Sequence, residues 1–151
     1  MSVPGPIVYY YTEGGQHPTH GNANAAGWDL PCSNPRVISI SPHQTVKVPT
    51  GIHLVMPHTL HAELKTRSSA ALKGLDVRGG IIDWDYRGEI GVIIHNSNDR
   101  VIVIDQGQRI AQLLFYGLAA DLVVLKEINE VTLELYRHTL RGDKGFGSTG
   151  K

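Results

Sequence analysis

The chain has 151 residues, enough for one domain with a buried core, and 41% of them are hydrophobic, which excludes a disordered chain. Fourteen basic and fourteen acidic residues cancel, so no overall charge favours nucleic acid or membrane as a partner, and a bound anion needs a local site. The single cysteine excludes an internal disulfide. With no signal-peptide pattern and no apolar run near the ~20 residues of a membrane span, we expect an intracellular protein, cytoplasmic by default, without excluding the nucleus.

Short apolar segments separated by Gly and Pro residues predict β-strands along most of the chain. The alternating segments are RVISI (36–40), GIHLVM (51–56), LHAELK (60–65) and VTLELY (131–136). More continuous runs, typical of fully buried strands, are IGVIIH (90–95), VIVI (101–104), RIAQLLF (109–115) and LVVL (122–125). The best helical candidate, SSAALKGL (68–75), has room for one or two turns. We therefore expect an all-β sandwich or barrel with at most one short helix.

Two early segments carry polar residues that fit either a binding site or ordinary turn chemistry. AAGWDL ends a small-residue turn at Asp29, which is either functional or hydrogen-bonded to its own backbone. KTRSSAALKG places Arg67, Ser68 and Ser69 where a strand gives way to a helical segment. Such a junction exposes backbone N–H groups to an anion, and the arginine adds a bidentate contact to phosphate. The alternative is a plain N-cap serine and a solvated turn.

GGIIDWDYRG contains two aspartates at the end of an apolar strand. Burying a carboxylate without a partner costs several kcal/mol, so Asp83 needs an explanation. A general base must be held rigidly, and a strand edge after two isoleucines provides such a position. Gly79 and Gly80 would let the backbone approach a ligand closely. A hairpin with DYRG as its turn explains Asp85 and Arg87 as solvated residues, but it explains Asp83 poorly.

Two later segments are ambiguous when taken alone. GQRIAQLL is a turn leading into a strand, with Gln112 as either a site residue or an edge amide. RGDKGFGSTG has an arginine, two hydroxyls and several glycines, which suit a polyphosphate, although it lacks the P-loop pattern and also fits a disordered tail. His58 and His61 are spaced like metal ligands, but no further ligand accompanies them, so we do not expect zinc.

Taken together and in this order, the five segments resemble the five motifs of the trimeric dUTP pyrophosphatases (dUTPases). The resemblance covers residues 26–150, and GIIDWDYRGE and RGDKGFGSTG match almost continuously. It implies a jelly-roll-like β subunit and a homotrimer with three active sites between its subunits. It also implies hydrolysis of dUTP to dUMP and pyrophosphate with Mg²⁺.

The resemblance assigns roles to individual residues. Asp83 matches the catalytic aspartate that activates water, Tyr86 the tyrosine that packs on the deoxyribose, and Asp29 the aspartate tied to the metal through water. The other matching positions bind substrate. The backbone near uracil matches Gly80 and Ile82, and the phosphate contacts match Arg67, Ser68, Ser69 and Gln112. The tail that folds over the nucleotide matches Arg141, Phe146, Gly147, Ser148 and Thr149.

Some features depart from the family pattern or leave another function open. Trp28 replaces a smaller residue before Asp29, and residues 113–140 separate the fourth and fifth motifs with predicted strands. We divide the chain into a β domain, 1–140, and a flexible glycine-rich lid, 141–151. A dCTP deaminase resembles this fold, but it looks as if it requires a glutamate where this chain has Ile93. A nucleotide-dependent regulatory protein that binds an unknown partner stays an alternative.

Overall fold

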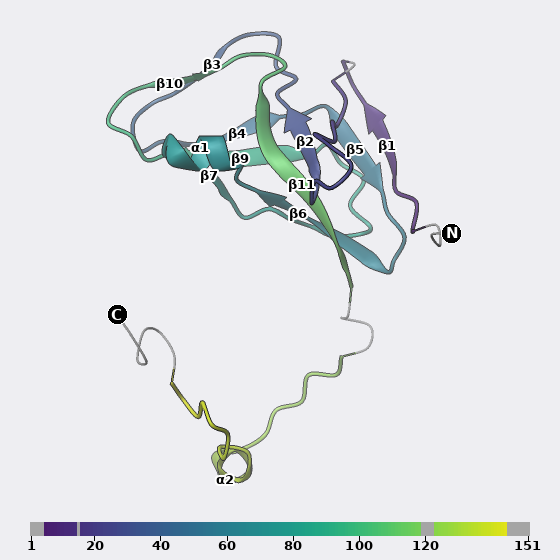
Figure 1. The fold of residues 1–151 in the computed structure, drawn as a ribbon, viewed down its shortest axis with the longest axis vertical. Coiled ribbons are helices and arrows are strands. Elements are labelled where there is room, and N and C mark those ends of the chain that lie inside the picture. The colour runs from purple at the N-terminus through teal and green to yellow at the C-terminus, as the bar shows by residue number, and fades with distance from the viewer. Residues whose placement is uncertain (1–4, 15, 119–122, 145–151) are drawn as a thin grey trace. The chain divides into compact units, whose positions relative to one another are not determined.

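The computed structural model describes residues 5–14, 16–118 and 123–144 (Figure 1). Short strands dominate the described residues, as the sequence predicted. In chain order the elements are β1 (Tyr9–Thr12), β2 (Trp28–Pro31), β3 (Ile38–Ile40), β4 (Thr45–Pro49), β5 (Ile52–Val55), β6 (Leu60–Lys65), α1 (Ser68–Leu72), β7 (Leu75–Arg78), β8 (Ile81–Ile82), β9 (Gly91–Asn96), β10 (Ile102–Ile104), β11 (Arg109–Gly117) and α2 (Glu130–Leu135).

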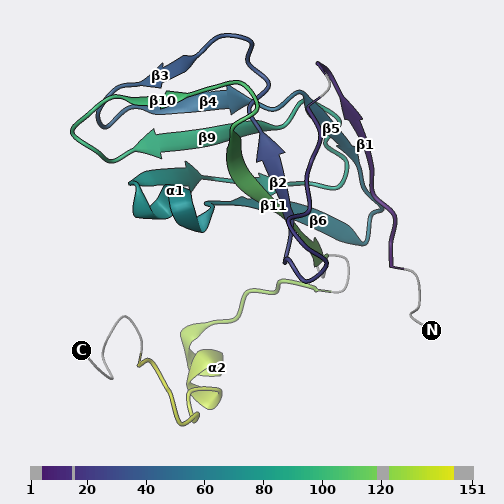
Figure 2. The ribbon, with the colours of Figure 1, turned by 45° about the horizontal axis from the view of Figure 1, so that its top comes forward.

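The strands pair antiparallel throughout the described part of the chain. One sheet has the order β2-β11-β6-β8 and another the order β4-β9-β7, while β1-β5 and β10-β3 form two-stranded ribbons. Figure 2 shows β9 between β4 and β7, with α1 beside β7. Strands far apart in sequence, such as β2 and β11, are neighbours, so the chain crosses between layers as in a jelly-roll-like sandwich. The all-β prediction is confirmed.

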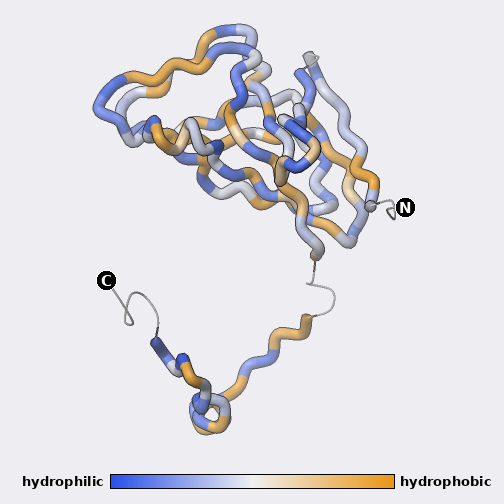
Figure 3. Tube along the Cα trace, viewed as in Figure 1, coloured by the Kyte–Doolittle hydropathy of each residue, from blue (hydrophilic) through white to orange (hydrophobic). Residues whose placement is uncertain are grey.

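Alternation along the strands places one set of side chains in a common core. Figure 3 shows hydrophobic and hydrophilic residues following one another along the trace. In β6, Ala62 and Leu64 are buried, and in β9, Val92 and Ile94 are buried while Ile93 between them faces outward. Successive side chains on a strand point to opposite faces, so each two-residue step returns to the core. The buried hydrophobic side chains form one cluster: Leu30, Cys32, Ile40, Val48, Ile52, Leu54, Met56, Ala62, Leu64, Leu75, Ile82, Ile90, Val92, Ile94, Ile104, Ile110, Ala111 and Leu113.

The chain divides into two compact units, residues 1–118 and 119–151, and the second differs from its prediction. VTLELY, predicted as a strand, forms the helix α2, and Val123–Leu125 of the predicted strand LVVL lie outside any strand. Asn129 starts α2 because its side chain accepts a hydrogen bond from Thr132 N at 2.8 Å. Without a neighbouring strand among the described residues, local capping and propensity decide. The structure therefore has one short helix more than expected.

The described residues contain no helix that is long and apolar enough to cross a membrane. The predicted division at residue 140 stays a prediction. Of the predicted lid, Phe146, Gly147, Ser148 and Thr149 lie outside the described residues.

Candidate active site

Asp83 lies directly after β8, at the first position of a tight turn. Ile82 before it is buried and pairs with Ala62 of β6, which anchors the strand. Tyr86 N then donates to Asp83 O at 3.1 Å and closes the turn. Both Asp83 and Asp85 are exposed, so neither pays the cost of burial. The arrangement holds the Asp83 carboxylate in solvent at the edge of a packed strand.

The turn spans residues 83–86, two residues earlier than the predicted DYRG turn. The Arg87 side chain accounts for this, because its Nη1 donates back to Trp84 O at 2.6 Å and so is not simply solvated. Tyr86 Oη donates to Glu89 O at 2.8 Å, which lays the ring across Gly88. A β-carbon at position 88 would run into the Tyr86 ring, so a larger residue there would displace this ring.

Glycine is required at position 80 by a contact within the chain that the sequence did not reveal. Its φ is +100°, and a β-carbon would meet Leu64 O at 2.6 Å. Leu64 N donates to Gly80 O at 2.8 Å. The close approach is therefore to β6 of the same chain. The same contact fixes the strand that leads to Asp83.

Four predicted site residues gather in one hollow of about 250 Å³, which we call the Asp83 hollow. It is lined by Lys47, Leu64, Arg78, Gly80, Ile81, Ile82, Asp83, Tyr86, Glu89, Ile90, Gly91 and Ile93. The sequence did not identify Lys47, Arg78 or Glu89 as site residues. Lys47 and Arg78 both pair with Ile93 in register, from opposite sides of β9. Their common face depends on strand pairing, which no local pattern reveals.

Five other predicted residues gather in a second hollow of about 350 Å³, which we call the Asp29 hollow. It is lined by Gly21, Ala25, Gly27, Asp29, Arg67, Ser68, Ser69 and Gln112. Asp29 of β2 and Gln112 of β11 face one another in register. Arg67 is the N-cap residue of α1, and the two serines are its first residues, as the strand-to-helix reading predicted. The β2-β11-β6 pairing thus unites three separate motifs.

The Asp29 carboxylate is 14% exposed and lies between two arginines. Arg67 Nε donates to Oδ1 at 3.0 Å, and Arg109 Nη1 lies 3.6 Å from Oδ2. Sequence reasoning missed Arg109, although it stands in the GQRIAQLL motif, because the contact depends on a register shift between Arg109 and Ala111. Two guanidinium groups against one carboxylate leave a net positive charge, which suits a polyanion.

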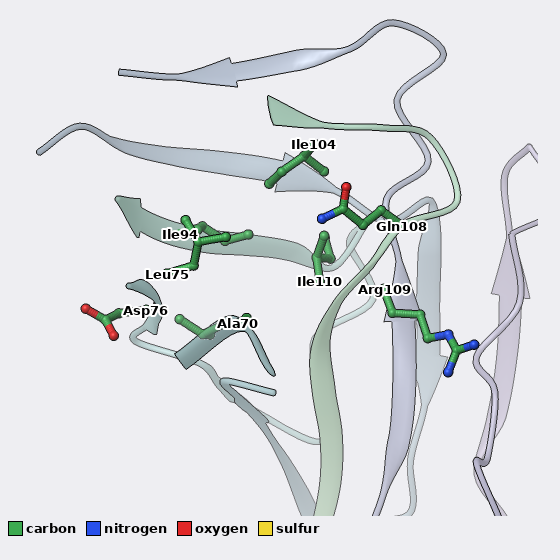
Figure 4. Close-up of a pocket in the computed structure, with 9 residues that line it drawn as sticks. Ala70, Leu75, Asp76, Ile94, Ile104, Gln108, Arg109 and Ile110 are labelled. Atoms are coloured by element: carbon green, nitrogen blue, oxygen red, sulfur yellow. The ribbon is translucent and has the colours of Figure 1, made fainter. Parts of the chain in front are cut away.

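A small cavity of about 20 Å³ lies beneath α1 and contains none of the predicted site residues (Figure 4). Its lining is mostly apolar and includes Ala70, Leu75, Ile94, Ile104 and Ile110. In Figure 4 the Arg109 side chain extends away from the group formed by these residues. The cavity has room for about one water and belongs to the core packing.

The described residues contain no cluster of three His, Cys, Asp or Glu side chains that could enclose a metal ion. Mg²⁺ usually keeps several waters and takes one or two carboxylates together with substrate phosphates. Asp29 fits such an ion through water, because each of its oxygens already faces an arginine. This donor set suits a metal ion that arrives with a polyphosphate.

The two hollows share no lining residue, so this chain presents the predicted site in two parts. Arg141 belongs to the second compact unit, where its Nε donates to Lys144 O at 2.7 Å. The remaining tail residues of the prediction fall outside the described ranges.

A family model, curated relatives and a solved structure all relate this chain to the same family. A protein-family model described as dUTPase matches residues 14–150. The chain is 38% identical over 145 residues to the deoxyuridine 5'-triphosphate nucleotidohydrolase of Candida albicans, covering 95% of this chain and 87% of the relative. The enzyme of the same name from Vaccinia virus is 36% identical over 151 residues, covering 99% and 97%. The dUTPase of Staphylococcus bacteriophage 80alpha, solved with dUPNHPP, superposes with a TM-score of 0.82 at 22% identity, covering 96% and 99%, which bears on the fold.

Proposed function

This chain belongs to the dUTPase family, and we propose that it hydrolyses dUTP to dUMP and pyrophosphate with Asp83 as the base that activates water. The place of Asp83 carries the proposal. Its carboxylate follows a buried strand, is exposed to solvent, and lies in a hollow with Tyr86 and the backbone of Gly80 and Ile82. A base so held has the fixed position that proton transfer requires.

The reaction breaks one bond and forms one. Asp83 takes a proton from water as the water oxygen attacks the α-phosphorus in line, and the bond from that phosphorus to the bridging oxygen of pyrophosphate breaks. Tyr86 packs on the deoxyribose, where its ring fills the space of a 2′-hydroxyl, and the backbone near Gly80 and Ile82 faces uracil. Tyr86 is suited to this role because its hydroxyl is held by Glu89 O.

The Asp29 hollow supplies positive charge for the triphosphate. Arg67 contributes a guanidinium fork, Ser68 and Ser69 contribute hydroxyls, and Gln112 contributes an amide. Members of this family depend on a divalent metal ion, and we propose Mg²⁺, held at Asp29 through water. When bound, this ion neutralises charge on the phosphates. Stabilising that charge is the largest contribution expected from this part of the site.

We further propose that the working enzyme is a homotrimer, in which the Asp83 hollow of one copy meets the Asp29 hollow of another. The support is that no residue lines both hollows, although water activation and phosphate binding must act on the same substrate. The tail residues Arg141 and Phe146–Thr149 would complete the site by folding over the nucleotide. Sedimentation equilibrium tests the trimer, and mixing a variant of each hollow tests the shared site, since mixed trimers should regain activity.

One assay tests the function. The protein is incubated with dUTP or dCTP and Mg²⁺, and the products are identified. Pyrophosphate and dUMP from dUTP are expected. Release of ammonia from dCTP would instead indicate deamination, which the apolar Ile93 in the Asp83 hollow argues against. Absence of turnover with either nucleotide, in a protein that still binds dUTP, would contradict the proposed hydrolysis.

A further inference from the structure

His53 of β5 joins two segments that are distant in sequence. Its Nδ1 lies 2.8 Å from Arg87 O, and its Nε2 lies 3.0 Å from Glu13 Oε1. The side chain is 24% exposed, so it is largely covered by these segments. Both partners are acceptors, a carbonyl and a carboxylate. A neutral imidazole carries one N–H, so both bonds form together only in the imidazolium.

The groups around His53 favour this charged form. The pKa of His53 is raised by the hydrogen bond to Arg87 O, and further by the carboxylates of Glu13 and Glu89, while desolvation opposes the rise. From β1 the Tyr11 ring lies 5.7 Å away, centroid to centroid. The guanidinium of Arg87 does not counteract this, because it turns back to Trp84 O. The charged groups that face the ring are therefore acidic.

The bond to Arg87 matters because the loop after Asp83 has few ties to the rest of the fold. Within residues 83–89 the hydrogen bonds are local: Tyr86 N to Asp83 O, Tyr86 Oη to Glu89 O, and Arg87 Nη1 to both Trp84 O and Tyr86 O. Within the described chain, two hydrogen bonds connect residues 83–89 to another element. One comes from His53 to Arg87 O, and the other from Gly51 N to Glu89 Oε1 at 2.9 Å.

We propose that protonated His53 is a positioning residue, which holds the loop carrying Asp83 and Tyr86 in its working geometry, and that deprotonation removes one of its two hydrogen bonds and so loosens the loop. The effect on catalysis rests on the proposed dUTP hydrolysis. His53 does not line the Asp83 hollow, and its hydrogen bonds go to Arg87 and Glu13, so it acts through these residues. A misplacement of about 1 Å at a reacting group costs up to about 100-fold in rate, so a loosened loop has a measurable effect.

The direction of the pH dependence follows from the raised pKa. The contribution of the second His53 hydrogen bond, which needs the charged ring, is complete below the ordinary histidine pKa of about 6.5 and is lost as pH rises through the higher pKa in the folded protein. Turnover should therefore show an alkaline decrease. Loop order should decrease over the same pH range, whether or not substrate is present.

Two substitutions at His53 allow its hydrogen bonds to Arg87 O and Glu13 to be tested separately. His53→Asn places an amide nitrogen near the position of Nδ1 and keeps the bond to Arg87 O, whereas His53→Gln places one near Nε2 and keeps the bond to Glu13. Neither side chain titrates. The matched control is His43→Asn, since His43 pairs with the distant Asp99 at 3.0 Å and its φ of 60° suits asparagine. Thermal melts verify that each variant folds.

The readouts are the pH profile of kcat/KM for dUTP and NMR signals of the His53 ring and the Arg87–Glu89 amides. We expect His53→Gln to lose on the order of 10-fold in kcat at pH 6 and His53→Asn to lose less. Both should lack the alkaline decrease, and Glu13→Gln should move it to lower pH. The amides should shift together with the His53 titration in the wild type, and the His43→Asn profile should match the wild type.

An unchanged rate and an unchanged pH profile in His53→Gln would overturn the proposal. Equal effects of His43→Asn and His53→Gln would also overturn it. If the wild type does not hydrolyse dUTP, the proposed function fails, and the NMR titration alone then tests whether His53 positions the loop. In that case amide shifts that follow His53 support its positioning role, and amides that ignore its titration refute it.

Discussion

The two hollows hold their key carboxylates in opposite ways. Asp83 stands exposed on a turn after a two-residue strand, and its loop is tied to the fold by His53 and Gly51. Asp29 lies on a strand paired in register, mostly buried between Arg67 and Arg109. Both carboxylate oxygens of Asp29 are engaged by arginines, whereas the solvent-facing carboxylate of Asp83 can reach water. This contrast fits the proposal that the Asp83 hollow activates water and the Asp29 hollow binds phosphate.

The largest effect should come from removing the base. Asp83→Asn keeps the shape of the side chain but cannot take a proton, so kcat should fall by roughly 100-fold or more with dUTP binding retained. Its control is Asp85→Asn, which alters an exposed carboxylate two residues away and should leave turnover nearly unchanged. Steady-state kinetics and calorimetric dUTP titration measure both. Similar losses in the two variants would remove the proposed distinction between these aspartates.

Deleting residues 141–151 tests whether the two hollows are sufficient for dUTP turnover without the predicted lid. The segment contains Arg141, proposed to contact the terminal phosphates, and Phe146, proposed to pack on uracil, so turnover should fall by on the order of 100-fold. Affinity for dUTP should fall more than affinity for dUMP, because dUMP lacks terminal phosphates. The melting temperature of the residue 1–118 unit should not change. Full-rate hydrolysis by the truncated chain would show that the hollows act alone.

Arg67→Lys tests the charge side of the comparison. Lysine retains the charge but loses the fork that contacts Asp29 Oδ1 at 3.0 Å, so the KM for dUTP should rise about 10-fold with a smaller change in kcat. Arg100→Lys, in the exposed loop before β10, is the matched control. A loss confined to kcat would assign Arg67 to the chemical step and weaken the division between the hollows.

The smallest effect expected concerns sugar selection in the Asp83 hollow. Tyr86→Ala opens the space of a 2′-hydroxyl, so the preference for dUTP over UTP in kcat/KM should narrow, by about 10-fold. Tyr86→Phe keeps the ring and removes its bond to Glu89 O, and it should retain most of the preference. If kcat/KM falls equally for dUTP and UTP in Tyr86→Ala, Tyr86 contributes packing and not sugar selection.

Local patterns predicted those features that local physics determines. The alternation of LHAELK placed Ala62 and Leu64 in the core, and the Arg67–Ser69 junction was identified from its residue types. The contact between Arg109 and Asp29 joins residues 80 positions apart, and no local pattern encodes it. The strand prediction for VTLELY was wrong because a six-residue alternation does not by itself distinguish a strand from a short helix, and Asn129 caps the helix.

The hairpin interpretation placed the turn after β8 two residues too late for a similar reason. Its position depends on the Arg87 guanidinium reaching Trp84 O, and the sequence marks that arginine only as polar. The role of His53 likewise requires Glu13 and Arg87 to meet from two sides of β5. Residue types therefore predicted the family, and the site positions stay predictions, while the contacts that support those residues required the tertiary structure.

Because Asp29 pairs with Gln112, nucleotide binding in the Asp29 hollow should depend on the correct register between β2 and β11. A slip of one residue between β2 and β11 would turn these side chains to the opposite face and separate Asp29 from Arg67. Misregistered chains would then fail to bind the triphosphate, while correctly paired chains would be stabilised by mass action. A nonhydrolysable nucleotide present during refolding should therefore enrich the native form, and recovery on an immobilised nucleotide should report the fraction of correctly registered molecules.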